Sequence, residues 1–227
     1  MLEEILPSCV AVAATHGEID AELFPEEEEA VANAVERRRR EFVTSRACAR
    51  AALGRLGLPA QAIPRGEHGA PRWPSGIVGS ITHCDGYRAC AVGHTADVAT
   101  LGVDAEPNQP LPEGLLPDIA LPRERVWLRD FATVAPEVHW DRLLFSIKES
   151  VYKAWFPLAE RWLGFEDAEV TVDREGRTFS ARFLVPGPTL GGRELTGLTG
   201  TWLVRDGIVL AAIAPPAADF ELQASAD

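Results

Sequence analysis

The sequence predicts an α+β fold made of two halves, each a small antiparallel sheet with packed helices. Helix-like segments followed by strand-like segments occur twice along the chain, whereas a parallel sheet would alternate strands with helices. With 227 residues and 46% hydrophobic side chains, the chain is long enough for one large domain or two small ones. We place the boundary so that the halves are 1–103 and 104–227.

The N-terminal half is predicted to hold two helices between a strand and a hairpin. Acidic residues 26–29 precede the first helix and Arg37 to Arg40 end it, as suits the helix dipole. The second helix ends at Gly57, before Pro59. The expected elements are a strand at 9–14, helices at 31–40 and 42–56, and hairpin strands at 77–82 and 87–93.

The C-terminal half is predicted to hold one long helix followed by four strands. A strand at 98–106 ends at Pro107 and leads into a proline-rich loop. No GxGxxG or P-loop pattern opens a helix, which argues against a Rossmann or Walker nucleotide site. The remaining expected elements are a helix at 141–158 and strands at 169–173, 178–184, 199–204 and 208–213.

Composition excludes several classes of protein. The net charge is −12 and neither half is basic, which disfavours nucleic-acid binding but leaves room for a local basic pocket. No apolar run approaches the roughly 20 residues that cross a bilayer. The segment 5–14 follows Glu3 and Glu4 rather than basic residues, so it is a poor signal peptide. We therefore expect a cytoplasmic protein with no membrane partner.

The four cysteines show neither a CxxC pair nor zinc-ligand spacing, and we expect reduced thiols. His83 and Cys84 are adjacent, and adjacent strand residues point to opposite faces, which disfavours a Cys–His nucleophile. The basic residues are more informative, because 20 of the 22 are arginine. Lys148 and Lys153 are the two lysines, which indicates chemistry that needs a compact ammonium group.

Two carboxylate motifs are candidates for chemistry. Asp104 and Glu106 share one face of a strand end, where they repel unless a cation lies between them. The alternative is a solvated strand edge. Glu149 and Lys153 are adjacent on one helix face, among aromatic residues. The alternative there is a surface ion pair worth a few tenths of a kcal/mol.

A third set is cationic. It comprises Arg37 to Arg40 with Arg46, Arg65 in a glycine-containing loop, and Thr82 with His83 at the hairpin turn. Arginines combined with backbone amides of such a loop can hold phosphate without a P-loop. Taken singly, each is also compatible with a solvated charge.

These motifs together resemble the 4′-phosphopantetheinyl transferases of the surfactin-synthetase and enterobactin-synthase-component type, in particular the form that serves mycobacterial lipid synthesis. The most specific part is Gly-Val-Asp-x-Glu at 102–106 with Lys-Glu-Ser-x-x-Lys at 148–153, about forty residues apart. The matching segments are 37–42 with Thr44 and Arg46, 78–84 with Gly86 and Tyr87, 102–107, 145–155 and 161–168.

The resemblance implies a fold and an activity. The fold is a pseudo-dimer of two similar halves, with coenzyme A bound in the cleft between them. The activity moves the phosphopantetheine arm of coenzyme A onto a serine of an acyl or peptidyl carrier protein and releases adenosine 3′,5′-bisphosphate. Expected partners are therefore carrier proteins and coenzyme A, with no nucleic acid, and the pseudo-dimer is expected to be a monomer.

The resemblance also implies roles for individual residues. Asp104, Glu106 and Glu149 are the expected ligands of Mg²⁺, with Mn²⁺ as an alternative. Glu149 is also the candidate general base. Lys153 stabilises the leaving bisphosphate and Lys148 holds the pyrophosphate. The expected contacts to the phosphates and adenosine of coenzyme A are Arg38, Arg46, Arg65 and His83, with Thr82 as a further contact through its hydroxyl.

Two features depart from the family pattern. His68 stands in the glycine-containing loop where a close relative has lysine, which would weaken the hold on coenzyme A above about pH 6.5 unless Arg72 compensates. Arg37 or Arg39 could replace Arg38 at the 3′-phosphate.

Because carriers are acidic and this chain is too, docking needs a local patch. We hypothesise that the loop 111–130 is that patch, through Leu115, Leu116, Ile119, Leu121, Arg123, Arg125 and Arg129.

Two other functions compete with the transferase. A magnesium-dependent phosphohydrolase would use the same carboxylates with water as the nucleophile, and would consume coenzyme A without a carrier. A coenzyme A-binding module would keep the cavity without catalysis. The presence of Asp104, Glu106, Glu149 and Lys153 together argues against the binding module.

Overall fold

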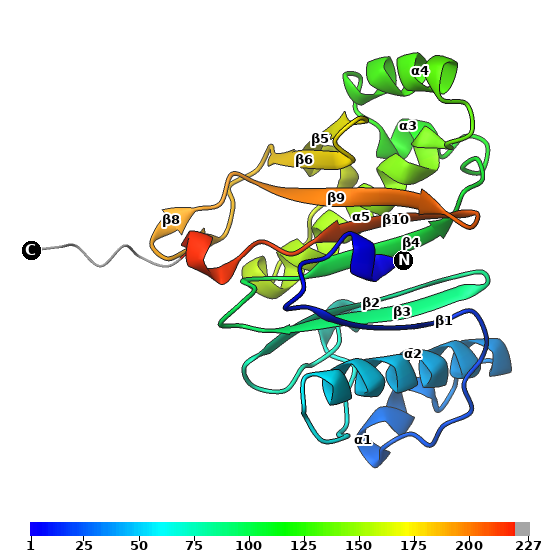
Figure 1. Cartoon of the computed structure of the whole chain (residues 1–227), viewed down its shortest axis with the longest axis vertical. Coiled ribbons are helices and arrows are strands. Elements are labelled where there is room, and N and C mark those ends of the chain that lie inside the picture. The colour runs from blue at the N-terminus through cyan, green and yellow to red at the C-terminus, as the bar shows by residue number, and fades with distance from the viewer. Residues whose placement is uncertain (221–227) are drawn as a thin grey trace, which may run out of the picture.

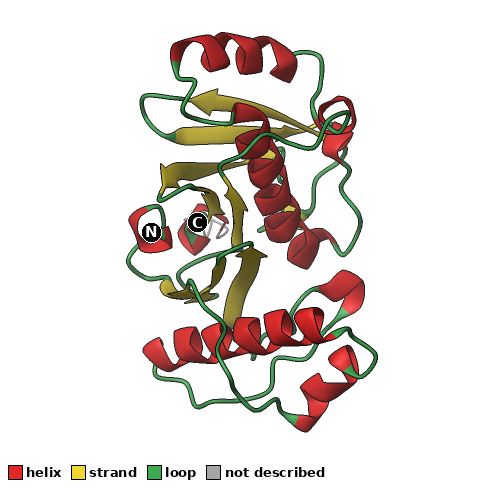
Figure 2. Ribbon diagram, turned by 90° about the vertical axis from the view of Figure 1, so that its right-hand side faces the viewer, coloured by secondary structure: helices red, strands yellow, loops and turns green. Residues whose placement is uncertain are grey.

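The structure is a computed structural model that describes residues 1–220. Helices α2 and α5 are the longest and lie in the lower and upper parts of the molecule (Figures 1 and 2). The helices are α1 (Pro25–Glu28), α2 (Glu36–Arg55), α3 (Leu116–Ile119), α4 (Glu124–Val134) and α5 (Trp140–Ala159), with 3-10 turns η1 (Leu2–Glu4), η2 (Glu29–Val31), η3 (Glu67–Gly69), η4 (Phe165–Asp167) and η5 (Ala217–Phe220).

Two antiparallel sheets form the centre. The first has the order β1-β3-β2 and the second the order β4-β10-β9-β6-β5, with a separate hairpin β7-β8. Helix α2 packs on the first sheet and α5 on the second. The strands are β1 (Ala11–Thr15), β2 (Ile77–Cys84), β3 (Tyr87–His94), β4 (Gly102–Pro107), β5 (Ala168–Asp173), β6 (Thr178–Phe183), β7 (Thr189–Leu190), β8 (Arg193–Glu194), β9 (Gly197–Arg205) and β10 (Ile208–Ile213). The mixed architecture with antiparallel sheets confirms the coarse α+β prediction.

Helix α5 buries an apolar stripe against the five-stranded sheet. Leu143, Leu144, Ile147, Val151 and Ala154 recur with helical spacing, and each is at most 1% exposed. Gly102 lets β4 approach this helix, because a Cβ there would overlap the carbonyl oxygen of Ser150. The glycine thus places the acidic end of β4 beside the polar face of α5.

The two sheets meet where β2 lies beside β4, and side chains there replace a backbone ladder. The hydroxyl of Ser80 accepts the Val103 amide at 3.0 Å, and that of Thr82 accepts the Ala105 amide at 2.9 Å. One hydrophobic core also crosses this junction, with Val12 and Tyr87 from the first sheet and Leu210 from the second. The predicted boundary between residues 103 and 104 falls inside β4.

Three predicted element boundaries are wrong. Arg37 to Arg40 do not end a first helix but open α2, which continues through 42–55; the break lies earlier, where Val35 is extended. Arg37 and Arg38 both pair with Glu41 one turn later, which stabilises this start. The strand predicted at 98–106 begins only at Gly102. The segment 111–130 is not a plain loop, because it contains α3 and the start of α4.

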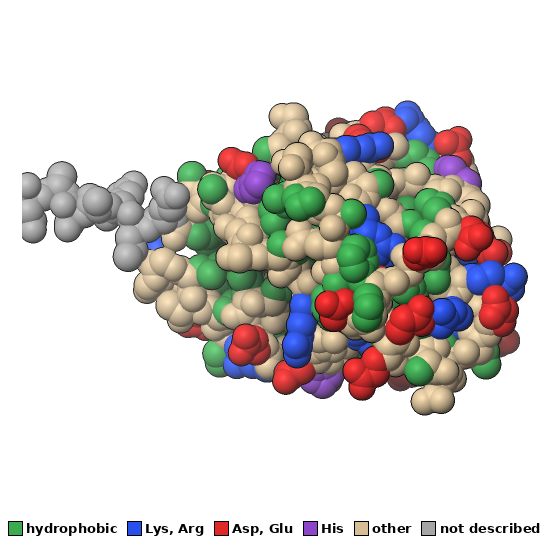
Figure 3. All heavy atoms as spheres, turned by 90° about the horizontal axis from the view of Figure 1, so that it is seen from below, with side chains coloured by type: hydrophobic (Ala, Val, Ile, Leu, Met, Phe, Trp, Pro, Cys, Tyr) green, Lys and Arg blue, Asp and Glu red, His purple; other side chains and the backbone are tan. Residues whose placement is uncertain are grey.

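No helix in residues 1–220 is both long enough and apolar enough to span a membrane. On the lower face, which Figure 3 shows, acidic and basic side chains are interspersed rather than separated.

Candidate active site

A cavity of about 340 Å³ lies between α2, the loop 65–73, β2 and α5; we call it the α2–α5 cavity. It brings together side chains that are far apart in the sequence. The predicted site residues that line it are Arg38, Arg46, Arg65, His83, Glu149 and Lys153. His68 also lines it, whereas Thr82, Asp104, Glu106 and Lys148 are not among its lining residues.

Arg38 and His83 form one contact at its rim. A guanidinium nitrogen of Arg38 lies 2.9 Å from Nε2 of His83. Because a guanidinium can only donate, Nε2 accepts and the imidazole is neutral. Burial, followed by the charge of Arg38, lowers the pKa of His83 below its ordinary value, and Glu41 opposes this shift. The positive charge of Arg38 is therefore not neutralised by its imidazole partner.

Arg46 is held more deeply, at 4% exposed. Its guanidinium stacks over Phe42 at 4.2 Å and lies 3.9 Å from the buried carboxylate of Glu27. Burial lowers the pKa of Arg46 to about 10, so that the side chain stays charged at neutral pH. Its Nε has no hydrogen-bond partner in residues 1–220, although it is buried. A buried donor of this kind is suited to an anion.

The loop that carries Arg65 folds back on itself. His68 and Gly69 both have positive φ, of 50° and 84°. A Cβ at Gly69 would lie 3.3 Å from the Arg65 guanidinium, so glycine there lets the arginine lie over the loop. The ring of His68 packs edge-on against Phe156 of α5, with centroids 5.4 Å apart. The loop is thereby tied to α5.

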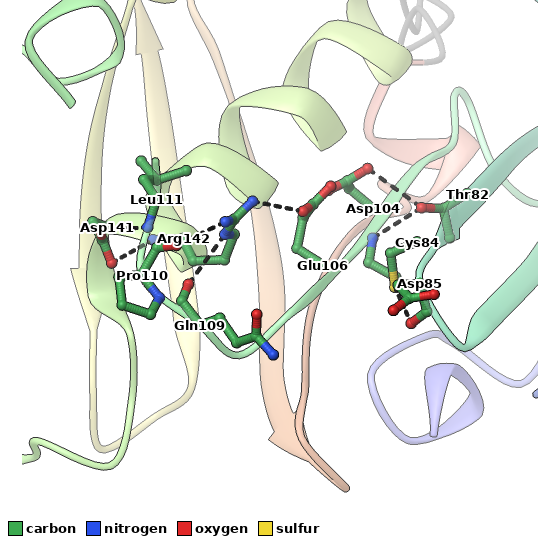
Figure 4. A network of polar contacts seen from close by, with 11 residues as sticks. Thr82, Cys84, Asp85, Asp104, Glu106, Gln109, Pro110, Leu111, Asp141 and Arg142 are labelled. Atoms are coloured by element: carbon green, nitrogen blue, oxygen red, sulfur yellow. Dashed lines mark hydrogen bonds and ion pairs between the residues drawn. The ribbon is translucent and has the colours of Figure 1, made fainter. Parts of the chain in front are cut away.

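The carboxylates lie at the junction of β4 and α5. Asp104 accepts a hydrogen bond from the Lys153 ammonium at 2.6 Å and one from the Thr82 hydroxyl at 3.3 Å. Glu106 pairs with Arg142 at 3.0 Å. Figure 4 shows both carboxylates between Thr82 on one side and Arg142 on the other. Thr82 is 1% exposed, and its hydroxyl accepts the amide of Ala105 in β4 besides donating to Asp104.

Burial and like charge also act on the glutamates. Burial raises the pKa of Glu149, the charge of Asp104 raises it further, and Lys153 opposes both. Burial and Asp104 likewise raise the pKa of Glu106, against Arg142. Asp104 therefore acts electrostatically on both other carboxylates, as expected for neighbours.

These carboxylates do not yet form a closed cage. In the described part of the chain, no three His, Cys, Asp or Glu side chains are close enough to hold a metal ion. The buried Oδ2 of Asp104 nevertheless has no hydrogen-bond partner among residues 1–220. An unsatisfied carboxylate oxygen has the donor chemistry that a hard divalent cation prefers.

Lys148 pairs with groups of the protein itself in this structure. It is 3% exposed and its ammonium lies 2.8 Å from the carboxylate of Glu124. It also donates to the carbonyls of Phe165 and Ala168, at 2.7 and 3.1 Å. These three acceptors account for its three N–H groups. In this structure the ammonium is directed to these acceptors, and Lys148 is not among the residues that line the α2–α5 cavity.

A second cavity of about 170 Å³ adjoins the first, and we call it the Trp162 cavity. Glu149 and Tyr152 line both cavities. No role was predicted for this cavity, although the segment 161–168 is one of the matching segments. Its other lining residues are Lys148, Val151, Trp162, Leu163, Gly164, Phe165 and Ala168.

The fold places a cavity lined by arginine and histidine side chains beside the carboxylates at the junction of β4 and α5. Such a site suits an enzyme that acts on an anionic substrate. Two family models match the chain: the 4′-phosphopantetheinyl transferase N-terminal domain over residues 26–93, and the 4′-phosphopantetheinyl transferase superfamily over residues 100–191. The chain belongs to this superfamily and is a 4′-phosphopantetheinyl transferase, which confirms the resemblance. The two models divide the chain a few residues before the predicted boundary.

Three relatives match over most of their length. The chain is 56% identical to the 4′-phosphopantetheinyl transferase Svp of Streptomyces mobaraensis, over 90% of this chain and 83% of the relative. It is 49% identical to the transferase Npt of Nocardia iowensis, over 94% and 99%. It is also 49% identical to the transferase PptT of Mycobacterium tuberculosis, over 84% and 85%.

Proposed function

We propose that this enzyme transfers the 4′-phosphopantetheine arm of coenzyme A to a serine of an acyl or peptidyl carrier protein, converting the apo carrier to its holo form. The serine oxygen bonds to the β-phosphorus of the pyrophosphate. The bond from that phosphorus to the bridging oxygen breaks, and adenosine 3′,5′-bisphosphate leaves. The observation that carries the proposal is the α2–α5 cavity, which combines five arginine or histidine side chains with Glu149 and Lys153.

The cationic side of the cavity binds the nucleotide end. Arg38, Arg46, Arg65 and His83 donate to the phosphates of adenosine 3′,5′-bisphosphate, and the orphaned Nε of Arg46 supports this assignment. The Trp162 cavity receives the pantetheine arm, because it is largely apolar and shares Glu149 and Tyr152 with the first cavity. In this pose the scissile phosphate lies beside Glu149.

Glu149 and Lys153 handle the proton and the leaving group. The raised pKa of Glu149 makes it a stronger base than an exposed glutamate, and it takes the proton of the carrier serine. The Lys153 ammonium, which pairs with Asp104 in this structure, stabilises the charge that develops on the departing bisphosphate. Positioning and positive charge supply most of the rate enhancement in phosphoryl transfer.

Asp104, Glu106 and Glu149 carry the oxygen donors that a divalent cation, Mg²⁺ or Mn²⁺, prefers, and they would have to move closer together to hold it. When bound, the ion neutralises charge on the pyrophosphate oxygens. Arg142 and Lys153 provide the positive charge beside the β4 carboxylates in this structure. The two halves form a pseudo-dimer with the active site in the cleft between them. A monomer in the cytoplasm remains our prediction.

The carrier docks on α3 and the start of α4. Arg123 is the most available part of this surface, with a side chain 84% exposed that pairs with Glu169. Val126 is 51% exposed beside it, whereas Ile119 is 2% exposed and belongs to the core. Arg125 donates to the carbonyls of Ala120 and Pro117, which gives it a structural role in the turn.

Intact-protein mass spectrometry of an apo carrier, incubated with the enzyme, coenzyme A and Mg²⁺, tests the activity. We expect a gain of one phosphopantetheine mass, abolished by EDTA. No gain on fatty-acid, polyketide or nonribosomal-peptide carriers, with coenzyme A consumed, would favour the phosphohydrolase. Coenzyme A bound but intact would favour the binding module.

A further inference from the structure

Lys148 lies directly before the proposed general base, yet its ammonium is enclosed in a network away from the α2–α5 cavity. Burial lowers its pKa, and Glu124 opposes that shift as its counter-ion. The three acceptors around it, from Glu124, Phe165 and Ala168, point at one nitrogen from three directions. A planar guanidinium fork cannot meet such a set, which accounts for lysine at this position in a chain where 20 of the 22 basic residues are arginine.

Glu124 is satisfied as completely as Lys148. It is 0% exposed and opens α4. Its carboxylate accepts the backbone amides of Leu121 and Val170, each at 2.7 Å, besides the ammonium of Lys148. A buried ion pair gains stability only when such further hydrogen bonds compensate the loss of water. Both partners meet this condition.

The pair joins three parts of the chain at the wall of the Trp162 cavity. Glu124 accepts the amide of Leu121, just before α4, and that of Val170 in β5. Lys148, on α5, donates to the carbonyls of Phe165 in η4 and Ala168 in β5. Phe165 and Ala168 themselves line that cavity, together with Lys148 and Glu149. The part of the cavity wall formed by Phe165 and Ala168 is therefore fixed through the ion pair.

We propose that Lys148 and Glu124 are positioning residues that hold the 165–168 wall of the Trp162 cavity in register with Glu149. The inference rests on the proposed function, because it takes the pantetheine arm as the occupant of this cavity. Neither side chain contacts the phosphates. The pair acts through the wall that confines the arm, and thereby places the scissile phosphate at Glu149.

Two ligands separate this role from a direct phosphate contact. Coenzyme A has the pantetheine arm, and adenosine 3′,5′-bisphosphate lacks it. We expect Lys148→Met and Glu124→Gln each to weaken coenzyme A binding about tenfold or more, measured by calorimetry, since a buried charged group loses its partner. Binding of the bisphosphate should change less than about twofold, because the arginines are untouched. The double variant should lose no more than the worse single variant, since both remove one pair.

Trp127→Phe is the matched control. The Trp127 indole donates to the Val170 carbonyl, so this variant loosens the same contact between α4 and β5 without touching Lys148. Both ligands should bind it as they bind the wild type. If Glu124→Gln does not fold, Glu124→Asp keeps the charge and shortens the side chain, and the same ligand-specific loss is expected.

Three results would overturn the inference. Loss of both ligands in Lys148→Met, with neither lost in Glu124→Gln, would make Lys148 a phosphate contact. Unchanged coenzyme A affinity in both folded variants would show that the pair does not position the wall. A wild-type protein that binds coenzyme A no more tightly than the bisphosphate, and transfers nothing, would overturn the proposed function as well.

Discussion

At the scale of single residues, the rarity of lysine pointed to two positions that need an ammonium group. The structure places both ammonium groups in contact with buried carboxylates, Glu124 and Asp104. The sequence could not tell that Lys148 turns away from the α2–α5 cavity. That depends on Glu124 and on the carbonyls at 165 and 168, which only the tertiary fold brings there.

The carboxylates give the first prediction. Asp104→Asn and Glu149→Gln keep size and hydrogen-bonding capacity but remove the charge, so transfer to an apo carrier should fall at least about a hundredfold. Thermal unfolding should confirm that both variants are folded. Asp20→Asn, an exposed position outside both cavities and outside the docking surface, serves as the control and should retain activity. If either site variant kept wild-type turnover at saturating Mg²⁺, the assignment of these carboxylates to the active site would be wrong.

His83 gives a prediction on pH. Its pKa is lowered in the free protein, and a bound phosphate dianion would raise it. Binding of adenosine 3′,5′-bisphosphate should therefore take up a proton, and affinity should rise as the pH falls from 8 to about 5.5. Calorimetry at several pH values measures this dependence.

The ligand phosphates titrate over the same range, so the comparison with a variant decides. His83→Gln retains an acceptor for Arg38 but cannot be protonated, and should show a shallower pH dependence than the wild type. His94→Gln, at the exposed end of β3, should behave as the wild type does. Equal slopes in the wild type and His83→Gln would contradict the assignment.

At the scale of elements, the junction between β2 and β4 combines stability with function. Ser80→Ala leaves the Val103 amide without its acceptor, which should cost about 1–3 kcal/mol of unfolding free energy and leave turnover close to normal. Thr82→Val should cost a similar amount and also lower turnover, because the Thr82 hydroxyl contacts Asp104. Thr82→Ser should restore both. Urea unfolding and steady-state kinetics together would reveal the difference; equal turnover in Ser80→Ala and Thr82→Val would contradict it.

Helix α4 gives the prediction for the carrier. Arg123→Glu reverses an exposed charge on the proposed docking surface and should raise the KM for an acidic carrier about threefold or more, leaving coenzyme A affinity unchanged. Arg182→Glu is the matched control, since Arg182 also pairs with Glu169 but lies on β6. An equal rise in both variants would assign the effect to Glu169, and no rise in Arg123→Glu would remove this docking surface.

The sequence predicted the long helix and most strands, but it did not predict α3 and α4, which lie in a segment expected to be a loop. The long helix and most strands lie within two residues of their predicted bounds, because periodic burial defines them. The start of α2 was missed because the charged run 36–41 has no apolar period, and its helical state comes from pairs with Glu41. Ser80 was missed for another reason. Its hydroxyl acquires a role only when β2 meets β4, a contact between different parts of the chain.

At the scale of the whole molecule, the two sheets share one hydrophobic core, which predicts that they unfold cooperatively. Val12 and Tyr87 from the first sheet pack in one cluster with Val103 and Leu210 from the second. Neither half keeps that cluster without the other, so both should unfold in a single transition. Two sets of probes are available. Cys48 and Cys90 are buried in the first half, and five of the six tryptophans lie at positions 127–202.

Urea unfolding followed by thiol labelling of Cys48 and Cys90 and by tryptophan fluorescence tests the claim. Coincident midpoints are expected, and Trp73→Phe, which removes the tryptophan of the first half, should leave the fluorescence midpoint equal to the labelling midpoint of the same variant. Labelling complete at a urea concentration where fluorescence is still native would show that the halves are separable domains. A single transition would instead mean that a ligand held between α2 and α5 stabilises both sheets at once, since it binds one cooperative unit.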